Sequence, residues 1–135
     1  GDGLLAIFPT EGTSSRARTC AAALDAANDT LGLAEQLSAA RRQTGKPTPG
    51  IDIALHDGRV QYGNVGSDTR LDFTVIGPAV NEASRIEALC QPLGRSLLIS
   101  QAFADAATQS GARLVSLGRH RLRGVREATE LFGLA

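Results

Sequence analysis

The fold is predicted above all by residues 71–90, LDFTVIGPAVNEASRIEALC. Residues 71–76 alternate and are rich in β-branched and aromatic side chains, a composition that favours a strand. Gly77 interrupts this run and Pro78 follows. Proline suits the first turn of a helix, because its missing N–H would have no partner there. The stretch therefore predicts a strand that turns directly into a helix.

The predicted helix carries one apolar stripe and, beside it, a polar pair. The stripe falls at steps of three and four residues and comprises Ala79, Val80, Ala83, Ile86 and Cys90. Asn81 and Arg85 lie off this stripe and are one helical turn apart, so they point in the same direction. A carboxamide and a guanidinium near a helix N-terminus can hold charged oxygens. Spacing alone leaves a solvated face as the alternative.

Length and charge limit the classes of protein that this chain can be. Its 135 residues make a single domain, residues 1–135, with a core of ordinary size. The chain has 14 basic and 14 acidic residues, so it offers no broad basic surface for nucleic acid or an anionic membrane. An anion site must therefore be local. Cys20 and Cys90 both lie in apolar helical patterns, which predicts buried, reduced thiols.

No apolar run approaches membrane-spanning length, and no signal peptide opens the chain. We expect a cytoplasmic domain, and a cytoplasmic domain of a membrane-attached parent would share these features.

Three short segments carry a resemblance to a known family: residues 73–77 (FTVIG), 80–81 (VN) and 83–87 (ASRIE). Together they resemble the most distinctive segment of the class III nucleotidyl cyclase catalytic domain. The resemblance implies an α+β fold of the ferredoxin-like, palm-like kind, with an antiparallel sheet sandwiched by helices. The order of elements along the chain independently indicates a sheet covered by helices.

Residues 1–3, Gly-Asp-Gly, precede an apolar run and predict a tight turn that leads into a buried strand. On its own, Asp2 is explained by that turn. The segment also resembles the cyclase element that carries the second of two metal-binding aspartates. The resemblance implies Asp2 as a ligand of Mg²⁺ or Mn²⁺, with two ions in each site.

The resemblance covers the C-terminal two-thirds of a cyclase domain. In the family, the first metal aspartate and a base-reading lysine precede the position of Gly1. We therefore expect the chain to be N-terminally incomplete and inactive alone.

The middle of the chain predicts a long helix and then a hairpin. Alanine-rich residues 14–43 read as the helix, and breaker-rich residues 44–50 end it. Residues 51–66 alternate and predict a hairpin that turns at residues 56–58. We interpret His56 as structural, since nothing in the sequence offers it a partner. The two glycines of residues 63–66 are a weak signal for a phosphate cradle.

The last third predicts a strand over residues 96–100, a helix over 101–108 with Ser100 as its N-cap, and two strands around residues 123–125. Residues 119–123 are the most basic part of the chain. They are explained either by a solvated edge strand or by contact with an anion. By the resemblance, Arg123 matches a basic residue that contacts nucleotide phosphates, with arginine in place of the usual lysine.

The family implies an adenylate cyclase that converts ATP to cyclic AMP and pyrophosphate. Arg85 would stabilise charge on the α-phosphate, Asn81 would orient the ribose, and Arg123 would bind the terminal phosphates. Thr74 falls where the purine is read, and a recognised subgroup, some of its members bicarbonate-responsive, carries threonine there. The sites of the family lie between two head-to-tail protomers, which implies a homodimer.

Two alternatives remain open. A catalytically inactive, cyclase-like regulatory or dimerisation domain would have lost the first metal ligand. A phosphate-binding or RNA-binding ferredoxin-like domain is the third possibility, which zero net charge and a single tyrosine with four phenylalanines disfavour.

Overall fold

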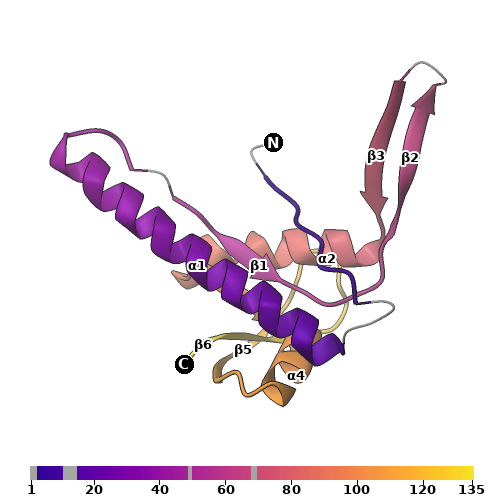
Figure 1. Cartoon of the computed structure of the whole chain (residues 1–135). Coiled ribbons are helices and arrows are strands. Elements are labelled where there is room, and N and C mark those ends of the chain that lie inside the picture. The colour runs from indigo at the N-terminus through magenta and orange to yellow at the C-terminus, as the bar shows by residue number, and fades with distance from the viewer. Residues whose placement is uncertain (1–2, 11–14, 49, 68–69) are drawn as a thin grey trace.

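The computed structural model describes residues 3–10, 15–48, 50–67 and 70–135. Their elements follow one another along the chain (Figure 1) as α1 (Arg16–Gln43), β1 (Ile53–Leu55), β2 (Gln61–Ser67), β3 (Arg70–Ile76), α2 (Pro78–Glu87), α3 (Cys90–Leu93), β4 (Leu97–Ser100), α4 (Gln101–Gln109), β5 (Leu114–His120) and β6 (Thr129–Leu134). None of the helices in these ranges is long and apolar enough to cross a membrane.

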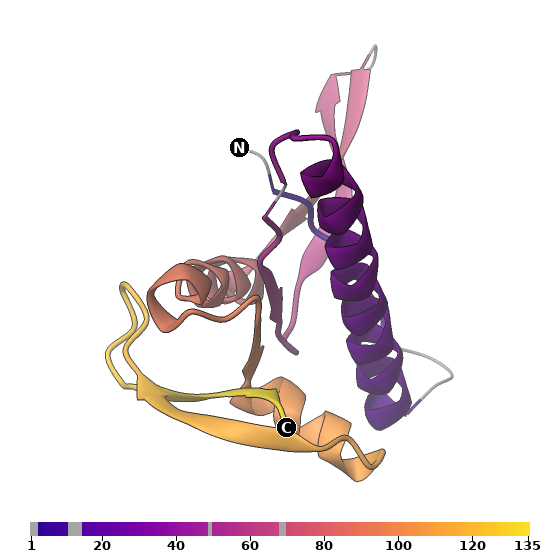
Figure 2. The same cartoon turned by 90° about the vertical axis from the view of Figure 1, so that its left-hand side faces the viewer.

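A four-stranded sheet in the order β1-β4-β6-β5 forms the centre of the molecule. β1 runs parallel to β4, while β4 and β5 are both antiparallel to β6. Helices cover both faces, and α1 and α2 lie on opposite sides of β1 in Figure 2. The predicted α+β architecture of a sheet sandwiched by helices is confirmed, with one parallel pair of strands.

The buried strand β4 separates two cores, because successive side chains of a strand point to opposite faces. Leu97 and Ile99 pack with α1 and α4 in the first core. Leu98 packs with Ile86 and Leu131 in the second core, beneath α2. Because β4 supplies both cores, it fixes α1 and α2 to one framework.

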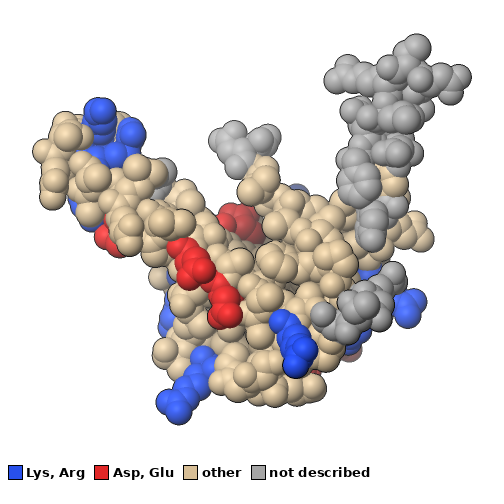
Figure 3. Space-filling view, viewed as in Figure 1, with Lys and Arg blue, Asp and Glu red and all other residues tan. Residues whose placement is uncertain are grey.

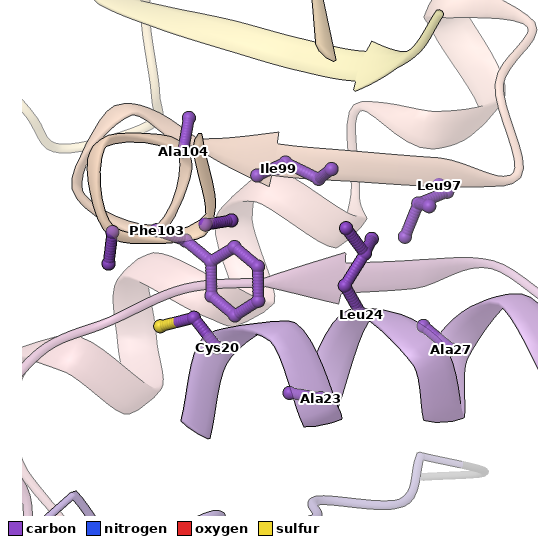
Figure 4. Packing of buried hydrophobic residues seen from close by; sticks show 10 residues of the cluster. Cys20, Ala23, Leu24, Ala27, Leu97, Ile99, Phe103 and Ala104 are labelled. Atoms are coloured by element: carbon purple, nitrogen blue, oxygen red, sulfur yellow. The ribbon is translucent and has the colours of Figure 1, made fainter. Parts of the chain in front are cut away.

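Small side chains let α1 approach the sheet closely. Figure 4 shows Cys20, Leu24 and Ala27 of α1 facing Ile99 and the ring of Phe103. The helix begins where the Ser15 Oγ accepts a hydrogen bond from the Arg18 backbone N–H at 3.1 Å, and it continues through Gly32 to Gln43.

Burial shifts the acidity of both thiols. Cys20 and Cys90 are free and buried, as predicted. Desolvation raises the pKa of the Cys20 thiol and raises the pKa of Cys90 to about 11. Both thiols are therefore protonated at neutral pH.

The predicted passage from strand to helix is confirmed. β3 ends at Ile76, and α2 begins at Pro78 after Gly77, whose φ of 145° is one that other residues rarely adopt. A Cβ on Gly77 would also lie 3.1 Å from the Arg59 carbonyl oxygen. The apolar stripe anchors the helix, with Ile86 only 1% exposed.

The predicted hairpin over residues 51–66 is wrong. β1 pairs with β4, and β2 instead pairs antiparallel with β3, from Gln61 opposite Ile76 to Ser67 opposite Arg70. The reason is that residues 56–58 form contacts with three helices and so do not close a turn between β1 and β2. Residues 63–66 consequently lie in the extended strand β2 and not in a turn. The β2–β3 hairpin projects away from the sheet in both views (Figures 1 and 2).

The predicted buried strand after residues 1–3 is also wrong. The described residues 3–10 form neither helix nor strand, and Leu4 is 95% exposed. A strand needs a neighbour for its backbone N–H and C=O groups, and this segment pairs with no strand in the described part of the chain. Asp2 lies outside the described residues.

Candidate functional site

Arg85 of α2 lies against Gly124 in the connection between β5 and β6. A Cβ placed on Gly124 would be 3.3 Å from the Arg85 Nη1 and 3.4 Å from its Cζ. Gly124 also has a φ of 77°, in the left-handed region that favours glycine. Both the backbone conformation and the close approach of the guanidinium therefore suit glycine at this position.

Two adjoining hollows flank this contact. The first has a volume of about 710 Å³ and is lined by Ser84, Arg85, Ala88, Leu89, Arg121, Leu122, Arg123, Gly124 and Val125. The second has a volume of about 600 Å³ and is lined by Gly77, Pro78, Asn81, Glu82, Arg85, Gly124, Val125 and Arg126. Because Arg85, Gly124 and Val125 line both, the fold brings the predicted site residues Asn81, Arg85 and Arg123 to one continuous depression.

The depression is locally basic although the whole chain has no net charge. Arg85 is partly buried, while Arg121, Arg123 and Arg126 are exposed around it. The carboxylate of Glu82 offsets one of these charges, and it is itself engaged by a histidine at 2.8 Å. Planar guanidinium groups match the oxygens of phosphate in pairs, so an anion with several phosphate oxygens suits this surface.

Away from this depression, the charged side chains are dispersed over the surface. On the face shown in Figure 3, Lys and Arg side chains lie in small separate groups, and acidic side chains lie along α1. Neither observation supports an extended nucleic-acid surface on that face.

Thr74 takes a different place from the other predicted site residues. It lies in β3 opposite Gly63, in the hairpin that projects from the body. β3 ends at Ile76, and the next residue, Gly77, already lines the hollow that Asn81 also lines. The side chain of Asn81 is exposed and belongs to the lining of the depression.

No metal cluster forms in the described part of the chain. Within those residues, no three His, Cys, Asp or Glu side chains gather closely enough to hold an ion. The depression is lined by guanidinium groups, which suit anions and repel a bare cation. The described residues thus include no such group of ligands, and the predicted ligand Asp2 lies outside them.

Sequence reasoning missed several residues of this region. Arg121 was named only as part of the basic stretch 119–123, and Arg126 was not singled out. Both lie after β5 ends at His120, so no strand pattern marks them. The partners of His56 left no local signal, since Ser100 is 44 residues away in the chain.

Known proteins resemble the chain in both sequence and fold. It is 38% identical over 101 residues to the adenylate cyclase of Anabaena cylindrica, covering 75% of this chain and 20% of that relative. It is 30% identical over 134 residues to adenylate cyclase 1 of Rhizobium meliloti, covering 98% of this chain and 19% of the relative. A solved bacterial light-regulated adenylyl cyclase superposes with a TM-score of 0.70 at 27% identity, over 89% of this chain and 34% of that one. The chain belongs to the class III nucleotidyl cyclases.

The fold of this cyclase domain agrees with a second solved protein. The adenylyl cyclase CyaB from P. aeruginosa superposes with a TM-score of 0.74 at 24% identity, over 93% of this chain and 63% of that one. That likeness confirms the cyclase type of α+β fold. The cyclase domain spans about a fifth of the length of the curated relatives it matches. No family model matches the chain.

Proposed function

We propose that this cyclase domain is an adenylate cyclase, which converts ATP to cyclic AMP and pyrophosphate. The observation that carries the proposal is the contact between Arg85 and Gly124, with Asn81 and Arg123 lining the adjoining hollows. In this reaction the ribose 3′ oxygen bonds to the α-phosphorus, and the bond from that phosphorus to the pyrophosphate oxygen breaks. Negative charge on the phosphate oxygens grows and shifts during the step, so arranged guanidinium groups lower its barrier.

The roles of the described residues follow from their positions. The guanidinium of Arg85 is partly buried and lies against Gly124. It therefore needs little movement to stabilise the charge that develops on the α-phosphate. Arg123 is exposed in the lining of the first hollow and would bind the terminal phosphates. Asn81 is one turn before Arg85 and would orient the ribose by hydrogen bonds from its carboxamide.

A divalent cofactor is proposed on the resemblance to the family. Two Mg²⁺ or Mn²⁺ ions, when bound, would activate the attacking oxygen and neutralise the triphosphate. Asp2 is the proposed ligand within this sequence. The part proposed for the described residues is to bind the phosphates and the sugar.

The proposal of ATP as the substrate rests on the names of two relatives and on the resemblance at Thr74. Two of the relatives that match the chain are named adenylate cyclases. By the resemblance to the family, Thr74 is proposed to read the purine, and a hydroxyl can donate to or accept from adenine. A hydroxyl also discriminates weakly against guanine, so the assay must include GTP.

We propose that the site is completed by a second copy of the domain. The side chain of Asn81 is exposed, and so are Arg121 and Arg123 across the depression. These groups therefore remain accessible to a nucleotide held by a neighbouring protomer, as in a head-to-tail dimer. The 135 residues alone are then expected to be inactive.

The test is a cyclic-nucleotide assay on a longer chain that includes the segment upstream of Gly1. ATP and GTP are supplied in parallel, each with Mg²⁺ and with Mn²⁺, and the product is separated by chromatography. The proposal is supported if cyclic AMP forms from ATP faster than cyclic GMP forms from GTP. A pure dimer that forms neither product under any of these conditions contradicts it and favours the non-catalytic regulatory alternative.

A further inference from the structure

His56 has two partners that come from distant parts of the chain. Its Nδ1 lies 2.8 Å from the Oγ of Ser100, at the junction of β4 and α4. Its Nε2 lies 2.8 Å from the Oε2 of Glu82 in α2. The imidazole thus links the end of β1 to two different helices.

The hydrogen bonds of the neighbours indicate where the protons lie. The Oγ of Ser100 already accepts the backbone N–H of Phe103 at 3.2 Å, which caps α4. The single hydroxyl proton of Ser100 is therefore available to donate to the Nδ1 of His56, and the Nε2–H of His56 then donates to the carboxylate of Glu82. All three side chains have hydrogen-bond partners in this arrangement.

A serine, a histidine and a carboxylate in line also suggest a nucleophilic triad, but the surroundings exclude it. Ser100 is 3% exposed and its oxygen caps a helix. Of the described residues, neither His56 nor Ser100 lines either hollow. A substrate carbonyl or phosphate cannot reach the hydroxyl, so the three residues are not a catalytic triad.

The residues after His56 extend the same connection. Asp57 pairs with Arg16 at the start of α1, with 3.2 Å between the Oδ2 and the Nε. Gly58 packs on α2, since a Cβ there would lie 2.6 Å from the Cβ of Ala79. The segment of residues 56–58 therefore contacts α1, α2 and α4 together.

The start of α2 depends on such contacts from outside the helix. Its N-cap is Gly77, which has no side chain to cap the first turn. Glu82 directly follows Asn81 and precedes Arg85 by three residues, so it sits on the turn that carries both. A hydrogen bond that holds Glu82 consequently restrains rotation of the helix about its axis.

We propose that His56, acting through Glu82, is a positioning residue that orients α2 so that Asn81 and Arg85 meet the nucleotide. This inference rests on the proposed cyclase activity. A small displacement of Asn81 or Arg85 should lower kcat more than it raises KM. The reason is that Arg123, the proposed contact of the terminal phosphates, lies on a different element from α2.

The first test measures kcat and KM in the longer chain described above. His56→Phe and Glu82→Ala are each expected to lower kcat by about 10- to 100-fold, with KM within about twofold of the wild-type value. Glu82→Gln keeps an oxygen that accepts from the Nε2–H, so it is expected to restore kcat to within about threefold of wild type. The double variant His56→Phe/Glu82→Ala should lose no more than the worse single variant, since both changes break one connection.

The matched control is Glu87→Ala, which removes an exposed carboxylate from the last turn of the same helix. Its kcat should stay within about twofold of wild type. Additive losses in the double variant, or no rescue by Glu82→Gln, overturn the proposal. So does a full kcat in His56→Phe.

A second measurement separates this inference from the cyclase proposal. Hydrogen exchange in the same longer chain should show amides of α2 exchanging about 10-fold faster in His56→Phe and Glu82→Ala, and unchanged in Glu82→Gln and Glu87→Ala. If the wild-type chain makes no cyclic nucleotide, the cyclase proposal fails, and the exchange rates still decide whether His56 orients α2. Equal rates in all variants overturn the inference whatever the activity.

Discussion

The guanidinium of Arg85 rests on the backbone of Gly124, with its Nη1 3.3 Å from the point that a Cβ would occupy. The two residues belong to different elements, the helix α2 and the connection between β5 and β6. Their contact joins the hollow that contains Asn81 to the hollow that contains Arg123. An arginine held in this way presents its charge to the depression from a defined position.

Substitution of Gly124 should disturb both stability and the site. Gly124→Ala places a Cβ at a φ of 77° and against the guanidinium, so we expect a loss of about 1–2 kcal/mol in the free energy of unfolding. In the longer chain, kcat should fall as Arg85 is displaced. Urea denaturation and a turnover assay measure the two effects.

Gly32→Ala is the control for that substitution. Gly32 lies inside α1, and nothing lies within 4 Å of the Cβ that alanine would add. Because alanine is the better helix former, this variant should be more stable by about 0.5–1 kcal/mol. Equal effects of the two substitutions would show that the environment of Gly124 is not special.

Removal of the Arg85 side chain should abolish most of the proposed activity. Arg85→Ala in the longer chain is expected to lower kcat by about 10²-fold or more, because an electrostatic stabiliser of the developing charge is lost. Circular dichroism should show an unchanged fold. Arg113→Ala, which removes an exposed arginine just before β5, serves as the control and should leave kcat unaltered. Unchanged cyclic-nucleotide production by Arg85→Ala removes Arg85 from the mechanism.

Truncation of Ile86 should test how α2 is anchored. Ile86 is 1% exposed and packs with Leu98 and Leu131, so Ile86→Ala should lower the free energy of unfolding by about 2–5 kcal/mol. Leu37→Ala on α1 is the control, since Leu37 is 52% exposed and should cost less than about 0.5 kcal/mol. Thermal unfolding of the two variants side by side gives the comparison.

The thiol of Cys90 should make stability fall at alkaline pH. Burial raises its pKa from an ordinary 9.0 to about 11, and the thiol lies 3.7 Å from the Ile53 carbonyl oxygen. The unfolded chain ionises this group first, so the folded state is favoured fully below pH 9 and loses that advantage as pH rises towards 11. The loss attributable to Cys90 is at most about 2–3 kcal/mol.

Cys90→Ala isolates this contribution. Its stability should be compared with that of the wild type by urea denaturation at intervals between pH 8 and about 11. The variant starts lower because of the cavity it creates, and the difference from wild type should shrink as pH rises. Cys20 is present in both proteins, so its contribution to the pH dependence of stability cancels in the difference. A difference that stays constant over this range contradicts a raised Cys90 pKa.

Local patterns in the sequence determined several elements correctly. The strand before Gly77 and the helix from Pro78 were predicted because proline, glycine and the spacing of apolar residues act within one or two turns of chain. Ser100 was predicted as an N-cap for the same reason, and its Oγ does accept the Phe103 N–H. The family resemblance rests on this same short region, which the relatives and the solved structures then confirmed.

Only the tertiary structure decided which strands pair and which side chains meet. β1 alternates as a hairpin strand would, yet it pairs with β4, because residues 56–58 bind three helices and leave no turn towards β2. His56 contacts Ser100 and Glu82, and Arg85 contacts Gly124. No local sequence pattern encodes these contacts. A residue's own propensities act over a few neighbours, whereas such contacts depend on how the sheet and its two cores bring distant segments together.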